Sequence, residues 1–189
     1  MRAVSVFDKY AHEYDILTNA KAREKHHQEE VRALIDRFCP ASVLAAGCAT
    51  GLTAALCARE GAETVGLDRS RAMIPEARRK YDRAGLSLKF VLGSFERLPK
   101  NLVGRFDLVV CLANSIAGVG TIGNLSKSLS GFRRVLKPGG ILVVQALNYQ
   151  AVSESEILPV RATQQGKVGY LRYARRRGSR QELTVVRLD

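Results

Sequence analysis

Small residues and one acid occupy defined places in the stretch from Val43 to Asp68. An apolar run at 43–46 leads into the turn sequence Gly-Cys-Ala-Thr-Gly at 47–51, and apolar residues at helical spacing follow. A second apolar run at 64–67 ends in Asp68. In such a strand, turn, helix and strand unit, small residues let the backbone approach a ligand, and the helix N-terminus offers N–H groups. A carboxylate at the tip of the second strand accepts ribose hydroxyls, so the unit predicts a nucleoside-containing cofactor.

The turn distinguishes between two classes of cofactor. A dinucleotide fingerprint needs G-x-G-x-x-G, and here Ala49 and Leu52 occupy the second and third glycine places. The remaining G-C-A-T-G resembles motif I of the class I S-adenosylmethionine-dependent methyltransferases, D/E-x-G-C-G-T-G, in which an acid corresponding to Asp68 binds the ribose. Ala45 replaces the acid that opens this motif, and Ala49 replaces a glycine. If position 49 needs a left-handed backbone, its Cβ costs about 1–2 kcal/mol.

Three further stretches are similar to the same family. RFDLVVCLANSIAGV, residues 105–119, resembles the glycine and sarcosine N-methyltransferase branch, where an asparagine corresponding to Asn114 helps to position the amine. GSFERLP, residues 93–99, resembles G-D-A-x-x-L-P, with Ser94 in place of the acid that meets the adenine amino group. RRVLKPGGILVVQALNY, residues 133–149, resembles the helix, turn and fifth strand of the family. Taken alone, Ser94 and Asn114 are also compatible with polar turns that leave a strand.

The resemblance implies residue roles. Residues 4–19 resemble the Y-D-x-x-A-x-x-Y-D opening of many class I methyltransferases, although an amphipathic helix packed on the domain explains them equally well. The implied cofactor-binding residues are Tyr14, Ala46, Gly47, Cys48, Gly51, Asp68, Arg69, Met73, Ser94, Phe95 and Leu112. The implied acceptor-positioning residues are Asn114, Asn148 and Tyr149, with no certain catalytic residue. Leu147 replaces the Arg that binds the substrate carboxylate in the glycine enzymes, so glycine is not expected as the substrate.

The elements that must position these residues follow from hydrophobic patterning. Helices are predicted at 22–38, 70–83 and 125–136, and apolar strands at 86–92 and 108–112. Together with the unit at 43–68, they predict an α/β, Rossmann-like methyltransferase fold: a central, mostly parallel sheet with helices on both faces and an antiparallel C-terminal strand pair.

Beyond residue 149 the pattern changes. Residues 150–166 predict mostly loop, and strands at 168–174 and 183–188, joined by a turn at 177–179, predict an antiparallel pair at one edge of the sheet. We expect a single domain over 1–189, made of an N-terminal helical cap (1–40), a cofactor-binding core (41–149) and a C-terminal strand pair (150–189). The C-terminal part is expected to be shortened relative to the family.

Composition limits the other classes of function. The net charge of +12 and the pI near 10.0 suit a nucleic-acid partner, but the basic residues are spread along helices, apart from a cluster at 175–177. No apolar run approaches the roughly 20 residues that span a bilayer, and no membrane partner is expected. Four cysteines without a C-x-x-C pair predict reduced thiols and a cytoplasmic protein. No metal site is expected, and the sequence does not fix an oligomeric state.

These observations predict an enzyme that transfers the methyl group of S-adenosylmethionine to a small-molecule acceptor, expected to be an amine nitrogen, and leaves S-adenosylhomocysteine. The N-P-P-Y or D-P-P-Y sequence of nucleobase amino-methyltransferases is absent after the fourth strand, where A-N-S-I stands instead. Two alternatives remain open: an RNA methyltransferase, favoured by the positive charge, and a non-catalytic cofactor-binding relative, favoured by Ala45 and Ala49.

Overall fold

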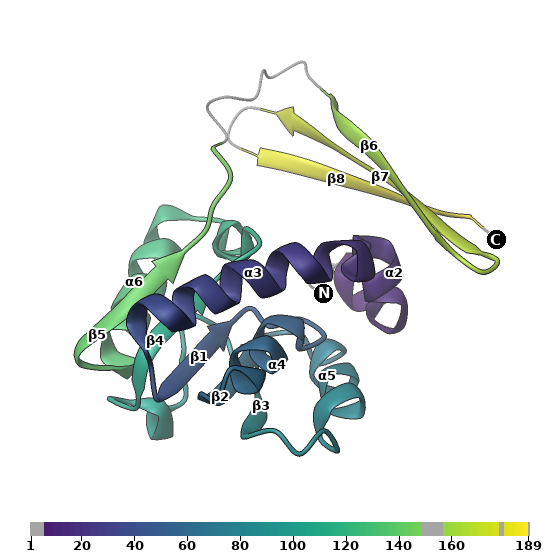
Figure 1. Ribbon diagram of the computed structural model, residues 1–189. Coiled ribbons are helices and arrows are strands. Elements are labelled where there is room, and N and C mark those ends of the chain that lie inside the picture. Colours follow the sequence, from purple (N-terminus) through teal and green to yellow (C-terminus); the bar gives the residue numbers. More distant parts are fainter. Residues whose placement is uncertain (1–5, 149–156, 178–179, 189) are drawn as a thin grey trace. The chain divides into compact units, whose positions relative to one another are not determined.

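The computed structural model describes residues 6–148, 157–177 and 180–188. The chain divides into two compact units: a core unit, Lys25–Ala146, and a terminal unit formed by Met1–Glu24 and Leu147–Asp189 (Figure 1). Helix α3 (Ala20–Phe38) confirms the helix predicted at 22–38. The boundary between the two units near the N-terminus falls within this helix. The predicted division of one domain into residues 1–40, 41–149 and 150–189 stays a prediction.

A parallel sheet of five strands forms the centre of the core unit. Its strands are β1 (Ser42–Ala46), β2 (Glu63–Asp68), β3 (Leu88–Leu92), β4 (Phe106–Cys111) and β5 (Leu136–Val144). They lie in the order β3-β2-β1-β4-β5, and every neighbouring pair is parallel. All five carboxyl ends therefore meet at one edge of the sheet, and the predicted α/β architecture is confirmed.

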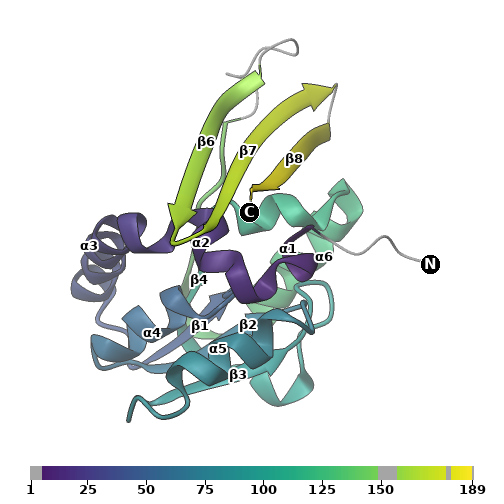
Figure 2. The ribbon, with the colours of Figure 1, turned by 90° about the vertical axis from the view of Figure 1, so that its right-hand side faces the viewer.

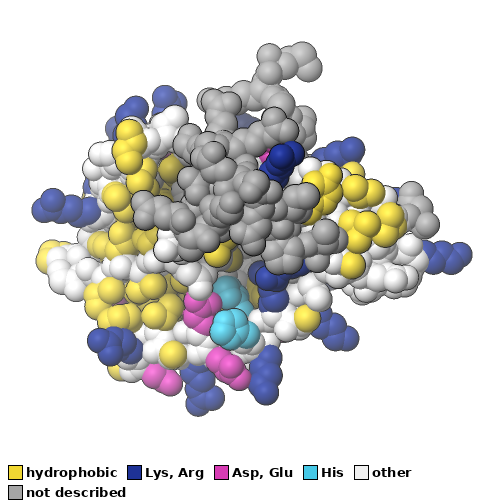
Figure 3. Space-filling model, turned by 90° about the horizontal axis from the view of Figure 1, so that it is seen from above, with side chains coloured by type: hydrophobic (Ala, Val, Ile, Leu, Met, Phe, Trp, Pro, Cys, Tyr) yellow, Lys and Arg dark blue, Asp and Glu magenta, His cyan; other side chains and the backbone are white. Residues whose placement is uncertain are grey.

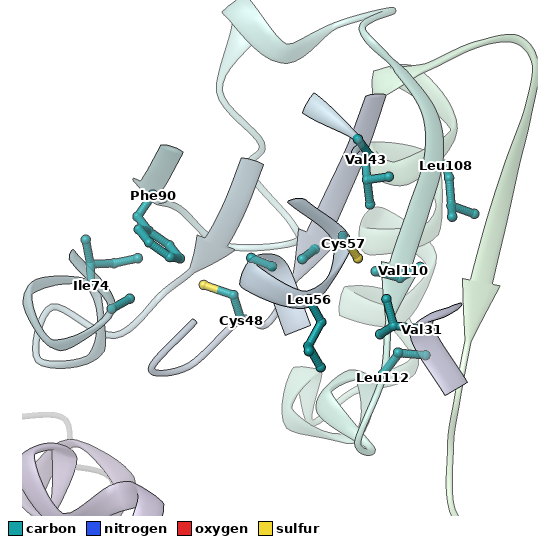
Figure 4. Packing of buried hydrophobic residues seen from close by; sticks show 14 residues of the cluster. Val31, Val43, Cys48, Leu56, Cys57, Ile74, Phe90, Leu108, Val110 and Leu112 are labelled. Carbon is teal, nitrogen blue, oxygen red and sulfur yellow. The ribbon is translucent and has the colours of Figure 1, made fainter. Parts of the chain in front are cut away.

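Helices cover both faces of this sheet. They are α3, α4 (Leu52–Arg59), α5 (Met73–Tyr81), α6 (Ile122–Val135) and the short 3-10 turns η2 (Lys100–Leu102) and η3 (Ser115–Val119). Because side chains alternate along a strand, β1 presents Val43 and Ala45 to one face and Leu44 and Ala46 to the other. The first face packs against α3, α4 and α5, and Figure 4 shows this apolar cluster, in which Val43 of β1 and Cys57 of α4 are labelled. The second face packs against α6, η2 and η3.

Most predicted boundaries differ from the observed ones by one to three residues, and two of the differences have a clear local cause. The helix expected to start after Ser70 begins at Met73, and the Ser70 hydroxyl accepts hydrogen bonds from the N–H groups of Ala72 (3.2 Å) and Met73 (3.1 Å). The turn expected at 137–140 lies inside β5 instead. Phe106 pairs with Leu136 but Leu108 pairs with Ile141, so these residues bulge out of a strand that has already begun.

The terminal unit contains a second sheet. Its elements are α1 (Val6–Lys9), η1 (Ala11–Glu13), α2 (Tyr14–Thr18), β6 (Ile157–Gln165), β7 (Val168–Arg177) and β8 (Arg180–Leu188). The strands form an antiparallel sheet in the order β6-β7-β8, so the predicted C-terminal strand pair is confirmed as β7 and β8. Its expected place at an edge of the central sheet is wrong, because β7 pairs with β6 and not with a core strand.

The loop predicted at 150–166 is also wrong over residues 157–165, which form β6. Pro159 and Gly166 favoured a loop, but a proline is tolerated in an edge strand, where its missing N–H is not needed by a neighbour. β6 is such an edge strand, and its register with β7 shifts between Leu158 and Arg161, next to the proline. The rest of the predicted loop, residues 150–156, and residues 178–179 of the predicted turn lie outside the described residues.

A buried tyrosine joins the N-terminal segment to this second sheet. Tyr170 of β7 is fully buried, its ring meets that of Tyr10 edge-on at 5.4 Å, and its hydroxyl donates a hydrogen bond to Glu13. The Arg187 Nε also donates to Glu13, at 3.1 Å. Arg187 and Tyr170 lower the pKa of Glu13, whereas burial and the Glu13 carboxylate raise the pKa of Tyr170 to about 12.

The turn after β1 has a left-handed backbone at three of its positions. The φ angles are 75° at Gly47, 46° at Ala49 and 95° at Gly51. A Cβ at Gly51 would come within 2.8 Å of the Phe90 ring, so this glycine is required for space as well as for conformation. Ala49 has no such freedom, and its Cβ adds strain to the turn.

An ion pair joins the amino ends of three strands at the opposite edge of the sheet. Lys137 Nζ lies 2.9 Å from both carboxylate oxygens of Asp107, and Ser42 donates to Asp107 Oδ2 through its N–H (2.9 Å) and its hydroxyl (2.7 Å). Lys137 and then Ser42 hold the pKa of Asp107 below its usual value. The Asp107 of the FDLVV stretch therefore has a structural role, in which it joins β4 to β1 and β5.

Replacing Ala49 by glycine is expected to stabilise the protein by about 0.5–1 kcal/mol. Relief of the Cβ strain, about 1–2 kcal/mol, exceeds the extra unfolded-state entropy of glycine, about 0.4–1 kcal/mol. Urea unfolding of wild type and Ala49→Gly measures the difference. Ala33→Gly, at an exposed position inside α3, is the control and should destabilise by about 0.5–1 kcal/mol. A destabilised Ala49→Gly variant would contradict the strain.

Replacing Asp107 by asparagine is expected to lower the free energy of unfolding by about 1–2 kcal/mol near neutral pH, a range reduced for partial solvent screening. The folded-state pKa is below the unfolded value of about 3.9, so this stabilisation is complete above that value and disappears as the pH falls through the folded pKa. The difference between wild type and variant should therefore shrink in acid, as measured by urea unfolding at several pH values.

Asp36→Asn is the matched control for this change. Asp36 pairs with Arg32 at 3.8 Å, and both side chains are about 70% exposed, so its loss should cost less than about 0.5 kcal/mol. An Asp107→Asn effect that is equally small, or that does not change with pH, would show that the ion pair and the Ser42 hydrogen bonds to Asp107 add nothing to stability.

Candidate functional site

The carboxyl edge of the parallel sheet is where an open α/β fold places its ligand. The strand order β3-β2-β1-β4-β5 reverses between β1 and β4, and ligands bind outside the carboxyl ends of the strands at such a switch point. In this chain the switch point is flanked by the turn at 47–51, by Asp68 at the end of β2 and by residues 112–115 after β4. Three stretches singled out in the sequence thus meet at one edge.

Backbone hydrogen bonds hold the turn after β1 against the end of β2. The N–H groups of Gly47 and Cys48 both donate to the carbonyl of Leu67, at 2.7 and 3.0 Å. The N–H of Ala49 donates to Asp68 Oδ2 at 2.8 Å, and the N–H of Ser70 donates to Asp68 Oδ1 at 2.9 Å. Backbone N–H groups therefore orient both oxygens of the Asp68 carboxylate at the carboxyl end of β2.

Side chains from two other loops converge on Gly47. The Ser115 hydroxyl donates to the Gly47 carbonyl at 3.4 Å, and a Cβ at Gly47 would lie 2.7 Å from Ser115 Cβ and 3.2 Å from the Phe95 ring. Glycine is thus required at position 47 for space and for its positive φ. Sequence reasoning named Phe95 but missed Ser115, although Ser115 directly follows Asn114 in the stretch that resembles the N-methyltransferases.

The loop after β3 begins beside Asp68. The N–H of Gly93 donates to the Asp68 carbonyl at 2.9 Å, and the N–H of Arg97 closes a short turn onto the Ser94 carbonyl at 3.1 Å. The Phe95 ring packs on Phe132 of α6 with its centroid 5.3 Å away. Ser94 is half-buried and follows Gly93 at this edge, and its role toward the adenine stays a prediction.

The loop after β4 turns sharply at Ala113 and Asn114. Both are left-handed, with φ of 52° and 63°, and asparagine tolerates this conformation better than most residues. Asn114 precedes η3 without a capping hydrogen bond from its side chain, so its side chain does not serve as a helix cap. The N–H of Ala113 donates to Gln145 Oε1 at 2.8 Å, and Gln145 Nε2 donates to Glu30 Oε1 at 2.9 Å.

A series of polar side-chain contacts that was not expected from the sequence continues from Glu30. His27 Nδ1 lies 3.2 Å from Glu30 Oε2, and His27 Nε2 lies 2.8 Å from the Thr53 hydroxyl at the start of α4. Side chains of α3, of α4 and of Gln145, which follows β5, are linked in this way at the carboxyl edge. His27 and Glu30 are neighbours on one face of α3, but Thr53 and Gln145 are distant from them in the sequence, and no local spacing relates these two to the helix.

Several predicted cofactor residues contribute packing or backbone rather than a side-chain group. The side chains of Ala46, Cys48, Met73 and Leu112 are buried, and Ala45, which replaces the motif I acid, lies in the apolar cluster with Cys48. Burial, followed by the charge of Asp68, raises the pKa of Cys48, which keeps its thiol neutral.

The remaining predicted residues lie in different parts of the chain. Arg69 is exposed, and its Nη1 donates to the carbonyl of Gly118 in η3 at 3.1 Å, at the same edge. Tyr14 begins α2 in the terminal unit, where its ring meets Phe7 edge-on at 5.9 Å. Asn148 also belongs to the terminal unit and is exposed, and Tyr149 lies outside the described residues.

Other kinds of site find no support in the described part of the chain. It contains no group of three or more His, Cys, Asp or Glu side chains that could hold a metal ion. None of its helices has the length and apolar character needed to cross a bilayer. On the face drawn in Figure 3, Lys and Arg side chains stand at separate points, and the residues described there do not form one basic patch.

Comparison with known proteins identifies the family. Residues 43–140, slightly more than half of the chain, match the family described as "Methyltransferase domain". The chain is 27% identical over 157 residues to the glycine/sarcosine/dimethylglycine N-methyltransferase of Actinopolyspora halophila, covering 78% of this chain and 28% of that protein. It is 27% identical over 143 residues to the glycine/sarcosine N-methyltransferase of Aphanothece halophytica, covering 76% of this chain and 54% of that protein.

The chain thus spans about half or less of the length of these two relatives. Among solved structures, it is similar to a SAM-bound amino pentose methyltransferase of Micromonospora echinaspora, with a TM-score of 0.71 and 19% identity. That alignment covers 90% of this chain and 80% of the other and shows a shared fold. Family match and fold agree with the motifs at the carboxyl edge, and the chain belongs to the class I S-adenosylmethionine-dependent methyltransferases.

Proposed function

We propose that this protein transfers the methyl group of S-adenosylmethionine to a small-molecule acceptor through an amine nitrogen, leaving S-adenosylhomocysteine. The observation that carries the proposal is the Asp68 carboxylate, which the N–H groups of Ala49 and Ser70 orient at the switch point of the sheet. A carboxylate accepts several hydrogen bonds at once, which suits the two ribose hydroxyls of a nucleoside.

The residues at the carboxyl edge fit the parts of this cofactor. Gly47 and Gly51 allow the left-handed, closely packed turn whose backbone would approach the cofactor. Asp68 would hold the ribose, and Ser94 with Phe95 would meet the adenine. When bound, the cofactor supplies the reactive methyl sulfonium, whereas the protein supplies binding and alignment. Alignment of two reactants contributes about 7–11 kcal/mol in favourable cases.

An amine acceptor is favoured by two related observations. Asn114 stands at the carboxyl edge, with a side chain that does not cap η3, in a stretch that resembles the glycine and sarcosine N-methyltransferases. The names of the similar proteins, glycine/sarcosine N-methyltransferase and amino pentose methyltransferase, also indicate methylation of nitrogen compounds. Asn148 and Tyr149 remain proposed acceptor residues. Leu147 in place of an arginine argues against glycine itself.

Two alternatives to an amine methyltransferase remain. An RNA acceptor rests on the net charge of +12, and a non-catalytic relative rests on Ala45, whose side chain lies in an apolar cluster where the family commonly has an acid. Methyl transfer to any acceptor would exclude the second, and transfer to RNA but to no amine would establish the first. A cytoplasmic location is also proposed, because the four cysteines are unpaired thiols.

Asp68→Asn is expected to weaken the binding of S-adenosylhomocysteine by about 1.5–3 kcal/mol, or roughly 10- to 150-fold, because a charged acceptor is replaced by a neutral amide of the same shape. Calorimetric titration of wild type and variant measures the change. Asp107→Asn is the matched control, since it makes the same change at the opposite edge of the sheet and should leave the affinity unaltered. Equal affinities of wild type and Asp68→Asn would remove Asp68 from the site.

A further inference from the structure

Two arginines face each other directly across the second sheet. Arg161 of β6 and Arg172 of β7 are partners in the antiparallel register, and Thr163 and Tyr170 are partners further along the same pair. Because side chains alternate between the two faces of a sheet, all four lie on the same face. Like charges directly opposite one another destabilise a strand pair, so this arrangement needs an explanation.

This face of the sheet is covered by the N-terminal segment of the same unit. Tyr170 is fully buried, and its ring packs against that of Tyr10. Helix α2 packs against both β6 and β7, and Figures 1 and 2 both show it next to these strands. A third guanidinium belongs to the same place. The Arg23 Nε donates to the carbonyl of Thr18, the last residue of α2, at 2.8 Å.

Arg23 and Arg161 lie close enough to Arg172 for their charges to act on its guanidinium group. Burial lowers the pKa of Arg172, and the charges of Arg23 and Arg161 lower it further, while Tyr14 raises it. Among the described residues, none of these three arginines forms an ion pair with a carboxylate. Arg187 differs, because Glu13 compensates its charge at 3.1 Å.

Two buried polar atoms on this face also lack partners. Arg172 Nε and Thr163 Oγ1 make no hydrogen bond within the described part of the chain. Buried polar atoms are nearly always hydrogen-bonded in folded proteins, so each such exception suggests a missing ligand or water. Both atoms can donate, and both stand beside uncompensated positive charge. Oxygen atoms of an anion would satisfy the donors and the charge together.

We propose that this face of the second sheet binds the oxyanion of a small molecule, a carboxylate or a phosphate group, through Arg23, Arg161, Arg172 and Thr163. The planar guanidinium fork matches the oxygen spacing of both anions, and the Thr163 hydroxyl adds a neutral donor. The site itself does not depend on methyl transfer. That the anion is part of the methyl acceptor rests on the proposed function.

The test is titration of the full chain with inorganic phosphate and, separately, with acetate, followed by calorimetry and by thermal unfolding. Wild type is expected to bind at least one of the two and to unfold at a higher temperature in its presence. Arg172→Met should weaken that binding about 10- to 100-fold, and Thr163→Val should weaken it less. Arg175→Met is the matched control, because Arg175 is exposed on the opposite face of β7 and loses the same charge.

Thermal unfolding in the absence of an anion distinguishes an anion-binding Arg172 from one with a purely structural role. Without an anion, Arg172→Met should unfold at the same or a higher temperature than wild type, because it removes repulsion and an unsatisfied N–H group. If the variant is instead less stable and still binds phosphate or acetate as wild type does, the proposal is overturned. Wild type that binds neither anion overturns it as well.

Failure of this site and failure of the proposed function are separable in the same samples. Binding of S-adenosylhomocysteine without binding of either anion removes the oxyanion site alone, and the reverse result removes the cofactor site alone. Turnover assays then assign the source of the anion. A loss in Arg172→Met confined to amines that carry a carboxylate or phosphate assigns the anion to the acceptor, whereas an equal loss with neutral amines overturns that assignment.

Discussion

The hydrogen bond from the Ala49 N–H to the Asp68 carboxylate is the contact on which the candidate site depends. It joins the turn after β1 to the end of β2, at the point where the strand order of the sheet reverses. The same carboxylate receives the Ser70 N–H, which leads into α5. One acid therefore sets the position of the turn and the start of the next helix, and it is also the group that we propose for the cofactor ribose. The strain at Ala49 accompanies this geometry.

Most of the core unit was predictable because its signals are local. Apolar runs followed by glycine, as at residues 43–51, specify a buried strand entering a turn, and the parallel order brings the strand ends to one edge. The role of Asp107 was not predictable, because it depends on Lys137 and Ser42, which the fold brings from other strands. The contact between His27 and Thr53 escaped prediction for the same reason, because the fold brings α3 and α4 together.

The terminal unit was predicted less well. Pro159 and Gly166 taken alone favour a loop. β6 accommodates the proline because it is an edge strand and because its register with β7 shifts next to the proline. The pairing of Arg161 with Arg172 could not be predicted from the sequence, because the register of the two strands determines cross-strand partners and spacing along the chain does not. The net charge of +12 suggested only a generally basic surface. Part of this charge belongs to one local cluster, Arg23, Arg161 and Arg172, that no carboxylate of the described residues compensates.

The most direct test of the central claim is a turnover assay in which the purified chain is incubated with methyl-labelled S-adenosylmethionine and a panel of small amines, with RNA as a separate arm. Mass spectrometry would follow both the methylated acceptor and S-adenosylhomocysteine. We expect equal amounts of the two products with at least one amine, and no label in RNA. Label in RNA alone, or no transfer by a folded sample that binds the cofactor, would contradict the central claim.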